Sequence, residues 1–317
     1  PGVRLVLTGA DQAAAGLSSF PLRFVPPGTQ PERTPFLPLA VDAVRWAGEP
    51  VAAVIAKSRA EAEAAAEAVL LEVDDAPAVV DARAAAETGA PHVWEGRTGN
   101  VVFDYRAGDH EAVATALAGA AHVVRERVEI SRVAAMTLEP RTCLAVPDGG
   151  GRLTLHTGTQ STHRIRGELA TVMGMAPESL RVVAQHTGGS FGMRNGGFPE
   201  DALALWAARE TGAPVRWRAT RSDSFLSDTQ SRVLSADCAL ALDADGRVTA
   251  LQVEGVAPVG AQLGPMAAHH MTANMAGLAG VYRVPAIAVA MRGVHVNTVH
   301  MAPYRGAEEV REIDDPV

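Results

Sequence analysis

The chain has 317 residues, and 47% of them are hydrophobic, which is enough for buried cores and for two domains. It carries 28 basic and 36 acidic residues, a net charge of −8, with no block of Lys or Arg, so its charge pattern argues against nucleic-acid binding. No apolar run approaches the roughly 20 residues of a membrane helix, and the N-terminal residues do not have the form of a signal peptide. We therefore expect a globular, cytoplasmic protein without a membrane span.

The sequence contains two cysteines, Cys143 and Cys238. They are too few for a four-thiolate iron–sulfur cluster, and their spacing is not that of a zinc site. We expect two reduced thiols inside the fold. If the protein takes part in redox chemistry, its electron-transfer clusters must therefore lie on another chain.

The first part of the chain predicts a small α/β unit that ends near residue 90. The expected elements are, in chain order, a strand at 3–8, a proline-rich surface loop at 21–38, a strand at 51–56, a helix from about 59 to 70 and a strand at 72–74. Ser58 and Glu61 have the spacing of a capping box, which favours a helix start there. This unit has no focus of chemically active residues, so we expect it to be structural, and residues 91–100 are the expected linker.

The second part of the chain predicts strands interspersed with helices. Strands are expected at 101–105, 123–130, up to about 146, 153–156, 180–183 and 215–219, helices at about 111–117, 162–173 and 199–211, and an antiparallel hairpin at 232–254 with its turn at 243–246. His269 and His270 are adjacent, so their side chains diverge, and no partner follows at ligand spacing. The sequence therefore predicts no metal site built from side chains. The whole pattern indicates a mixed fold, α+β and α/β.

Two corners of this second part carry the residues of greatest interest. At the first corner, Gln160 lies between the strand 153–156 and the helix that follows it. At the second corner, the glycine loop (residues 187–195) lies between a strand and the helix that opens at Pro199. Glycines let main-chain N–H groups converge on an oxygen-rich ligand. If the two preceding strands are parallel, both corners lie at the same edge of the sheet and could face one ligand.

Six short motifs are distributed along the chain. They are Gly48-Glu49-Pro50-Val51-Ala52, Leu138-Glu139-Pro140-Arg141, Thr159-Gln160, Gly188-Gly189-Ser190-Phe191-Gly192, Asn297-Thr298 and Tyr304-Arg305-Gly306. In this order and at this spacing, they resemble the molybdenum-carrying large subunit of the xanthine dehydrogenase, aldehyde oxidase and carbon monoxide dehydrogenase family. The resemblance implies that residues 1–90 form an α/β hammerhead domain and that residues 101–317 form the first of two molybdopterin-binding domains.

The resemblance also assigns roles to the matching residues. It implies cofactor contacts for Gln160, Gly189, Ser190, Phe191, Gly192 and Arg305. Of these, Gln160, Phe191 and Arg305 are the expected catalytic residues, with Gln160 hydrogen-bonded to an oxo ligand of molybdenum. The implied cofactor is molybdenum-molybdopterin in a dinucleotide form, whose dithiolene holds the metal without a protein ligand.

Positions at which this chain differs from the family pattern narrow the range of substrates that we expect. Purine-oxidising members carry a glutamate just after the glycine core, where this chain has Asn195, and an aromatic residue where it has Ala307. Asn195 is therefore the expected substrate contact, and a purine is disfavoured. Carbon monoxide dehydrogenases carry a copper-binding cysteine directly after the arginine that matches Arg305, where this chain has Gly306. An aldehyde or a small aromatic heterocycle remains as the expected substrate.

The resemblance covers only the N-terminal half of such a subunit, whose general-base glutamate lies in the other half. We therefore expect a multi-chain complex with a chain that supplies the second molybdopterin domain, an iron–sulfur subunit with [2Fe–2S] clusters and an FAD subunit. The alternative is a truncated or non-catalytic relative that acts as a structural or assembly subunit without cofactor. A phosphate cradle for a nucleotide is a poorer interpretation, since neither Lys-Ser nor Lys-Thr follows the glycines.

Overall fold

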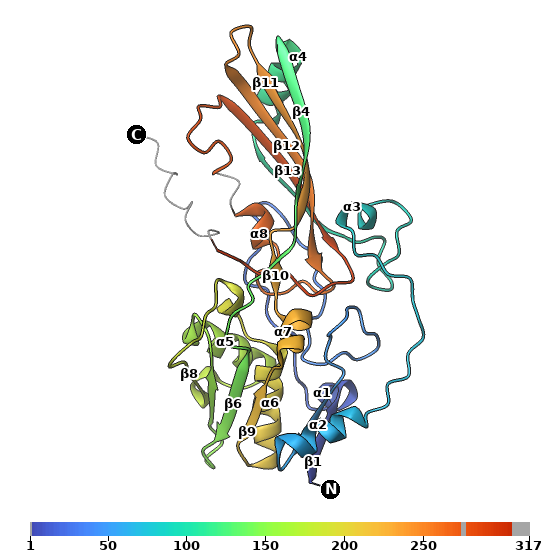
Figure 1. The fold of residues 1–317 in the computed structure, drawn as a ribbon, viewed down its shortest axis with the longest axis vertical. Coiled ribbons are helices and arrows are strands. Elements are labelled where there is room, and N and C mark those ends of the chain that lie inside the picture. The colour runs from blue at the N-terminus through green and yellow to red at the C-terminus, as the bar shows by residue number, and fades with distance from the viewer. Residues whose placement is uncertain (1, 274–276, 306–317) are drawn as a thin grey trace. The chain divides into compact units, whose positions relative to one another are not determined.

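The structure is a computed structural model that describes residues 2–273 and 277–305 (Figure 1). The chain forms two compact units, and each unit draws on several segments of the sequence. The first unit comprises Pro1–Pro21, Pro35–Pro77 and Ala135–Thr229. The second unit comprises Leu22–Thr34, Ala78–Ala134 and Gln230–Val317. Each unit is described by itself below.

A four-stranded sheet forms the centre of the first unit. Its strands follow the order β8 (Leu180–Val183), β7 (Leu153–Thr157), β6 (Thr142–Pro147) and β9 (Val215–Arg218). β7 and β8 are parallel, whereas β6 is antiparallel to both of its neighbours, β7 and β9. The parallel pair satisfies the condition under which the two corners lie at one edge of the sheet.

Helices pack on this sheet through apolar faces. Helix α5 (Thr162–Val172) contacts β8, and helix α6 (Pro199–Thr211) contacts β6, β7 and β9. Leu155, Leu169 and Leu205 are completely buried between these elements. Because each buried leucine side chain removes a large apolar area from water, this cluster holds the helices to the sheet. The spacing of apolar residues predicted α5, and the proline and acidic residues at its start predicted α6.

Local signals set the ends of these helices. Helix α5 begins after Ser161, whose hydroxyl accepts a hydrogen bond from the N–H of Arg164, so Ser161 is its N-cap. Helix α6 starts at a proline, and it ends at Gly212, which has a left-handed φ of 62°. The remaining short helices of this unit are η1 (Pro177–Ser179), η2 (Met193–Asn195) and α7 (Arg221–Ser227).

The N-terminal residues add a second, smaller sheet to the first unit. Strands β1 (Val3–Thr8) and β2 (Ala52–Ala56) pair antiparallel, with α1 (Gly9–Ala14) and α2 (Arg59–Glu67) as their helices. The hydroxyl of Ser58 accepts from the N–H of Glu61, as the capping-box spacing predicts. The predicted strand at 72–74 is wrong, because no described strand pairs with this exposed segment.

A five-stranded sheet dominates the second unit (Figure 1). Its strands follow the order β3 (Val101–Gly108), β13 (Ala286–His295), β12 (Val248–Gly260), β11 (Leu234–Leu242) and β4 (His122–Ile130). Only the pairing of β12 with β13 is parallel among these described strands. The hairpin of β11 and β12 was predicted, and Asp243 closes its turn by accepting from the N–H groups of Asp245 and Arg247.

Shorter elements complete the second unit. They are α3 (Ala82–Ala85), α4 (His110–Gly119), α8 (His269–Thr272), β5 (Val133–Ala134) and β10 (Gln230–Ser231). Helix α4 packs on β11, β12 and β13, and β5 pairs with β10. Val259, Met271 and Met291 are buried in the main core of this unit.

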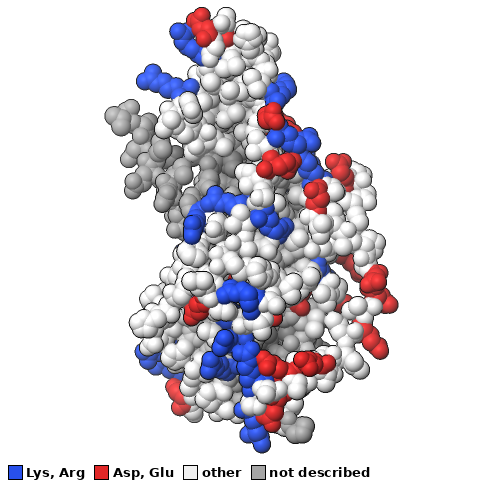
Figure 2. Space-filling model, in the orientation of Figure 1, with Lys and Arg blue, Asp and Glu red and all other residues white. Residues whose placement is uncertain are grey.

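The predicted fold class, a mixed fold of helices and sheets, agrees with this architecture. The boundaries at residues 90 and 100 and the hammerhead assignment stay predictions. None of the described helices is both long and apolar enough to cross a membrane. On the face drawn in Figure 2, both basic and acidic side chains lie at the surface of each unit.

Candidate functional site

The two predicted corners meet in the first unit. Gln160 follows β7, and the glycine loop follows β8, which is parallel to β7. The hydroxyl of Ser190 donates a hydrogen bond to Oε1 of Gln160 over 2.5 Å. The expectation that the two corners lie together at one edge of the sheet is therefore confirmed, and a ligand shared by both corners stays a prediction.

The glycine loop presents unpaired main-chain donors. Gly189 and Gly192 have positive φ values of 107° and 100°, which favour glycine because it has no Cβ. Phe191 between them has a φ of 55°, an uncommon conformation for a bulky residue. Within the described residues, the N–H groups of Gly189, Ser190 and Gly192 donate to no acceptor. The free N–H groups of Gly189, Ser190 and Gly192 in such a turn can form a cradle for an oxygen-rich ligand.

The carboxamide of Gln160 has a fixed orientation. Its Oε1 accepts from Ser190, while its main-chain N–H donates to the carbonyl of Arg194 over 3.1 Å. Its Nε2 makes no hydrogen bond to the described part of the chain, and the residue is exposed. The corner therefore offers two further N–H donors beside those of the glycine loop.

Arg194, the residue next to Asn195 in the loop, is a buried cation that the sequence did not single out. Its side chain is 2% exposed and forms an ion pair with Glu139 at 2.6 Å. Oε2 of Glu139 also accepts from the N–H of Gly188 over 2.7 Å. The only sequence signal for this contact is that Glu139 belongs to one motif and Arg194 closely follows another, and the burial of an arginine cannot be inferred from that.

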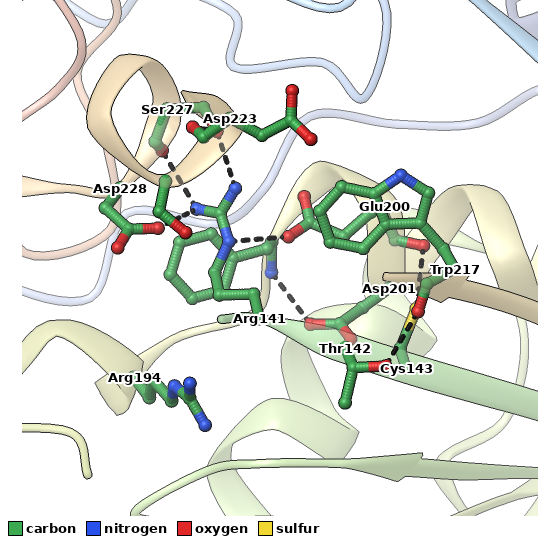
Figure 3. Close-up of polar contacts among 12 residues, drawn as sticks. Arg141, Thr142, Cys143, Arg194, Glu200, Asp201, Trp217, Asp223, Ser227 and Asp228 are labelled. Atoms are coloured by element: carbon green, nitrogen blue, oxygen red, sulfur yellow. Dashed lines mark hydrogen bonds and ion pairs between the residues drawn. The ribbon is translucent and has the colours of Figure 1, made fainter. Parts of the chain in front are cut away.

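A second buried cation, Arg141, lies on the entry to β6 (Figure 3). Its Nε lies 2.8 Å from Oε1 of Glu200, and its Nη1 lies 3.3 Å from Oδ1 of Asp228. It also donates to the carbonyl and the hydroxyl of Ser227, over 2.9 and 2.7 Å. The guanidinium stacks over the ring of Phe198, 4.2 Å from its centroid. Arg141 thereby ties β6 to α6 and α7.

Burial changes the acidity of the carboxyl groups around Arg141. Burial, with the charge of neighbouring Glu200, raises the pKa of Asp201 to about 7. Burial also raises the pKa of Glu200 and of Asp228, against the opposing effect of Arg141. Three carboxyl groups thus share one close cation, so part of the cluster is protonated near neutral pH.

Replacing Asp201 with Asn should weaken the pH dependence of stability in the first unit. The folded pKa of Asp201 of about 7 exceeds the usual aspartate pKa of 3.8, so the folded state holds an extra proton between about pH 4 and 7. The free energy of unfolding of the unmodified protein therefore falls as the pH rises through this window, by at most about 1.4 kcal/mol per pH unit for this group. The variant keeps an acceptor for the N–H of Phe198 but cannot ionise.

Urea unfolding at several pH values checks this expectation. Tryptophan fluorescence reports mainly on the first unit, which contains Trp46, Trp206 and Trp217. Asp74→Asn, a change at an exposed site, is the matched control and should keep the slope of the unmodified protein. An unchanged slope for Asp201→Asn would contradict the raised pKa.

The surroundings of the other two predicted site residues, Arg305 and Asn195, differ from those of Gln160. Arg305 belongs to the second unit, where its guanidinium lies 5.6 Å from the ring centroid of Tyr304. Its φ of 38° is another left-handed value, and its assignment to the cofactor site stays a prediction. Asn195 is buried, and its Oδ1 accepts from the guanidinium of Arg164 on α5. Its substrate role stays a prediction as well. Gly306 and Ala307 lie outside the described residues.

The remaining candidates are the two thiols and the side chains that could bind a metal. Cys143 and Cys238 are free, and burial raises the pKa of the Cys143 thiol well above its usual range. This agrees with the prediction of two unpaired thiols, although Cys238 is only partly buried. In the described residues, no three His, Cys, Asp or Glu side chains gather as a metal-ligand set.

Comparison with known proteins gives one family match. Residues 93–313 match the family described as the molybdopterin cofactor-binding domain. The 6-hydroxypseudooxynicotine dehydrogenase complex subunit gamma of Paenarthrobacter nicotinovorans is 32% identical over 96% of this chain and 38% of its own length. The nicotine 6-hydroxylase large subunit of the same organism is 33% identical over 96% of this chain and 37% of its own length.

A solved structure is similar over the same range. It is quinoline 2-oxidoreductase from Pseudomonas putida 86, with a TM-score of 0.87 and 33% identity over 96% of this chain and 39% of that chain. The present chain therefore spans well under half the length of the proteins that it matches.

Proposed function

The chain belongs to the family of molybdopterin cofactor-binding domains carried by molybdenum hydroxylase large subunits, and on this premise we propose that it supplies one wall of a molybdenum site. The enzyme containing it would hydroxylate a small aromatic heterocycle or an aldehyde. What supports this proposal most directly is the cluster of unpaired N–H donors formed by Gln160, Gly189, Ser190 and Gly192.

The donor set fits a cofactor that presents oxygen atoms to it. The carboxamide of Gln160 can donate to an oxo group without protonating it, because a neutral amide does not release its proton. The N–H groups of Gly189 and Gly192 can stabilise negative charge that develops on oxygen during the reaction. Glu139, whose Oε2 accepts from the N–H of Gly188 at the start of the loop, is neutralised by Arg194, so it would not repel an anionic group.

The cofactor and the residues of this chain would have different roles in this chemistry. The molybdenum-molybdopterin group would supply oxygen transfer and electron acceptance when bound. The residues of this chain would orient the group: Gln160 through its amide, and Phe191 with Gly192 through the backbone of the glycine loop. Arg305 would contact the edge of the cofactor. A dinucleotide form of the cofactor belongs to the same proposal.

The substrate and partners are also part of the proposal. Two similar proteins are named for nicotine and quinoline, both of which contain an aromatic nitrogen ring, so a heterocycle is favoured over an aldehyde. The chain would act with a chain supplying the second molybdopterin domain and its catalytic base. Partner chains with [2Fe–2S] clusters and FAD would carry the electrons away.

Metal and pterin analysis tests the proposal. The complex is purified from its native host, digested, and assayed for molybdenum by mass spectrometry and for pterin by the fluorescence of its oxidised derivative. We expect about one molybdenum and one pterin per chain, a stoichiometry set by a single donor cluster. A complex that contains neither group would contradict the proposal and would favour a structural or assembly role.

A further inference from the structure

Arg194 is anchored by its side chain to the segment that precedes β6. Its Nη1 lies 2.6 Å from Oε2 of Glu139, and its Nη2 donates to Oγ1 of Thr137 over 3.2 Å and to the carbonyl of Glu139. A buried guanidinium with several hydrogen-bond partners and a carboxylate is held in one geometry, since leaving any of these groups unpaired is costly.

The main chain of Arg194 holds the Gln160 corner. Its carbonyl accepts from the N–H of Gln160 over 3.1 Å and from the hydroxyl of Thr159 over 3.2 Å. Its N–H donates to Oγ of Ser190 over 3.1 Å, and the same hydroxyl donates to Oε1 of Gln160. Both the backbone and the carboxamide orientation of Gln160 are thus fixed through one residue.

The same network reaches the start of the glycine loop. Oε2 of Glu139, which neutralises Arg194, accepts from the N–H of Gly188. Two non-glycine residues on the joined segments, Met136 and Phe191, have left-handed φ values of 44° and 55°. Such conformations persist only where the surroundings impose them, and the Arg194 contacts tie together the segments that contain both.

Because Gly158 has no side chain, the guanidinium of Arg194 can occupy the space beside it. A Cβ placed on Gly158 would lie 2.4 Å from Nη1 of Arg194, which is too close for two nonbonded atoms. Gly158 has no left-handed φ, so an alanine there meets no backbone strain. The Gly158→Ala change can therefore displace the guanidinium without removing its charge.

We propose that Arg194 is a positioning residue that locks Gln160, the glycine loop and the segment 137–139 into one arrangement for the bound cofactor. This inference rests on the proposed function for its consequence in catalysis. Its structural part, the lock itself, concerns contacts within the first unit alone. The two parts can be measured separately.

Hydrogen exchange tests the lock. In Arg194→Met, the amides of Gly188, Gln160 and Arg194 should exchange roughly tenfold faster or more, because charge-assisted hydrogen bonds that restrain them are lost. Amides of α6 and β6 should keep their protection. Gly158→Ala should produce the same local pattern, and Arg194→Lys, which can retain the contact with Glu139, should restore part of the protection.

Matched controls separate positioning from general stability. Arg209→Met removes a partly exposed arginine of the same unit, and Gly167→Ala adds a Cβ where no atom lies within 4 Å. Neither should change exchange at the two corners. Faster exchange throughout the first unit in Arg194→Met and Gly158→Ala, or no local change in either, would overturn the inference.

Kinetics of the holoenzyme test the consequence. In Arg194→Met with normal molybdenum and pterin content, kcat should fall about tenfold or more with little change in KM, because a displaced Gln160 loses hydrogen bonds to the reacting group rather than to the substrate. The Arg194→Lys variant should recover part of kcat. An unaltered kcat would overturn the catalytic part. Absence of molybdenum in the unmodified complex would instead refute the proposed function. The hydrogen-exchange result would then decide by itself whether Arg194 holds these segments together.

Discussion

Gln160→Ala should lower kcat of the assembled, cofactor-loaded enzyme by about 10²–10³, the usual cost of one donor to an oxyanion. The substitution removes the Nε2 donor and also the acceptor of the Ser190 hydroxyl. It leaves the main-chain bond from residue 160 to the Arg194 carbonyl available, so the corner should keep its fold. Steady-state rates, normalised to the molybdenum content of each preparation, give the measurement.

Gln30→Ala provides the matched control for this prediction. Gln30 is exposed and belongs to the second unit, so the same loss of a carboxamide should leave turnover unchanged. Thermal unfolding of both variants should agree with that of the unmodified chain. A Gln160→Ala enzyme with full cofactor content and normal turnover would remove Gln160 from the proposed site.

Arg141→Met should destabilise the first unit by about 3–5 kcal/mol, because it leaves the carboxylates of Glu200 and Asp228 buried without their cation. Methionine preserves much of the apolar contact with Phe198 but cannot donate to Ser227. The loss should be smaller at pH 5 than at pH 8. At the lower pH, carboxyl groups with raised pKa values take up protons and no longer need a cation.

Urea unfolding followed by tryptophan fluorescence measures this loss, and Arg59→Met serves as its control. Arg59 and Glu63 form an ion pair at 2.6 Å on α2, but both side chains are more than half exposed. Removal of this surface pair should cost no more than about 0.5 kcal/mol. Equal losses for the two variants would show that the Arg141 cluster is not a buried ion network.

Local sequence signals were sufficient for the elements around the candidate site. A strand, a glycine-rich turn and a proline-started helix are each specified within a few neighbouring residues. The placement of Gln160 opposite the loop then required only that β7 and β8 be parallel. The resemblance to a family gave the candidate roles, and the roles of Gln160, Phe191, Arg305 and Asn195 stay predictions.

Contacts between residues far apart in the sequence could not be predicted from local sequence signals. β13 was not predicted, and its place between β3 and β12 depends on pairings with distant parts of the chain. The contact between Arg194 and Glu139 spans 55 residues. An arginine and a glutamate look like surface residues in a sequence, because charged side chains are rarely buried. Only the fold reveals that the arginine is buried and that it pairs with this partly exposed glutamate.

The alternation of chain segments between the two units bears on how the protein is made. Leu7, Phe36 and Leu205 share one core, so the first unit cannot close before residues near 205 have left the ribosome. β3 must wait for β13, its only described strand partner, which ends at His295. At roughly 5–20 residues per second, the wait lasts on the order of 10–40 s. During synthesis, apolar strands of both units therefore stay unpaired together, which leaves their edges exposed for longer than if each unit were one continuous segment.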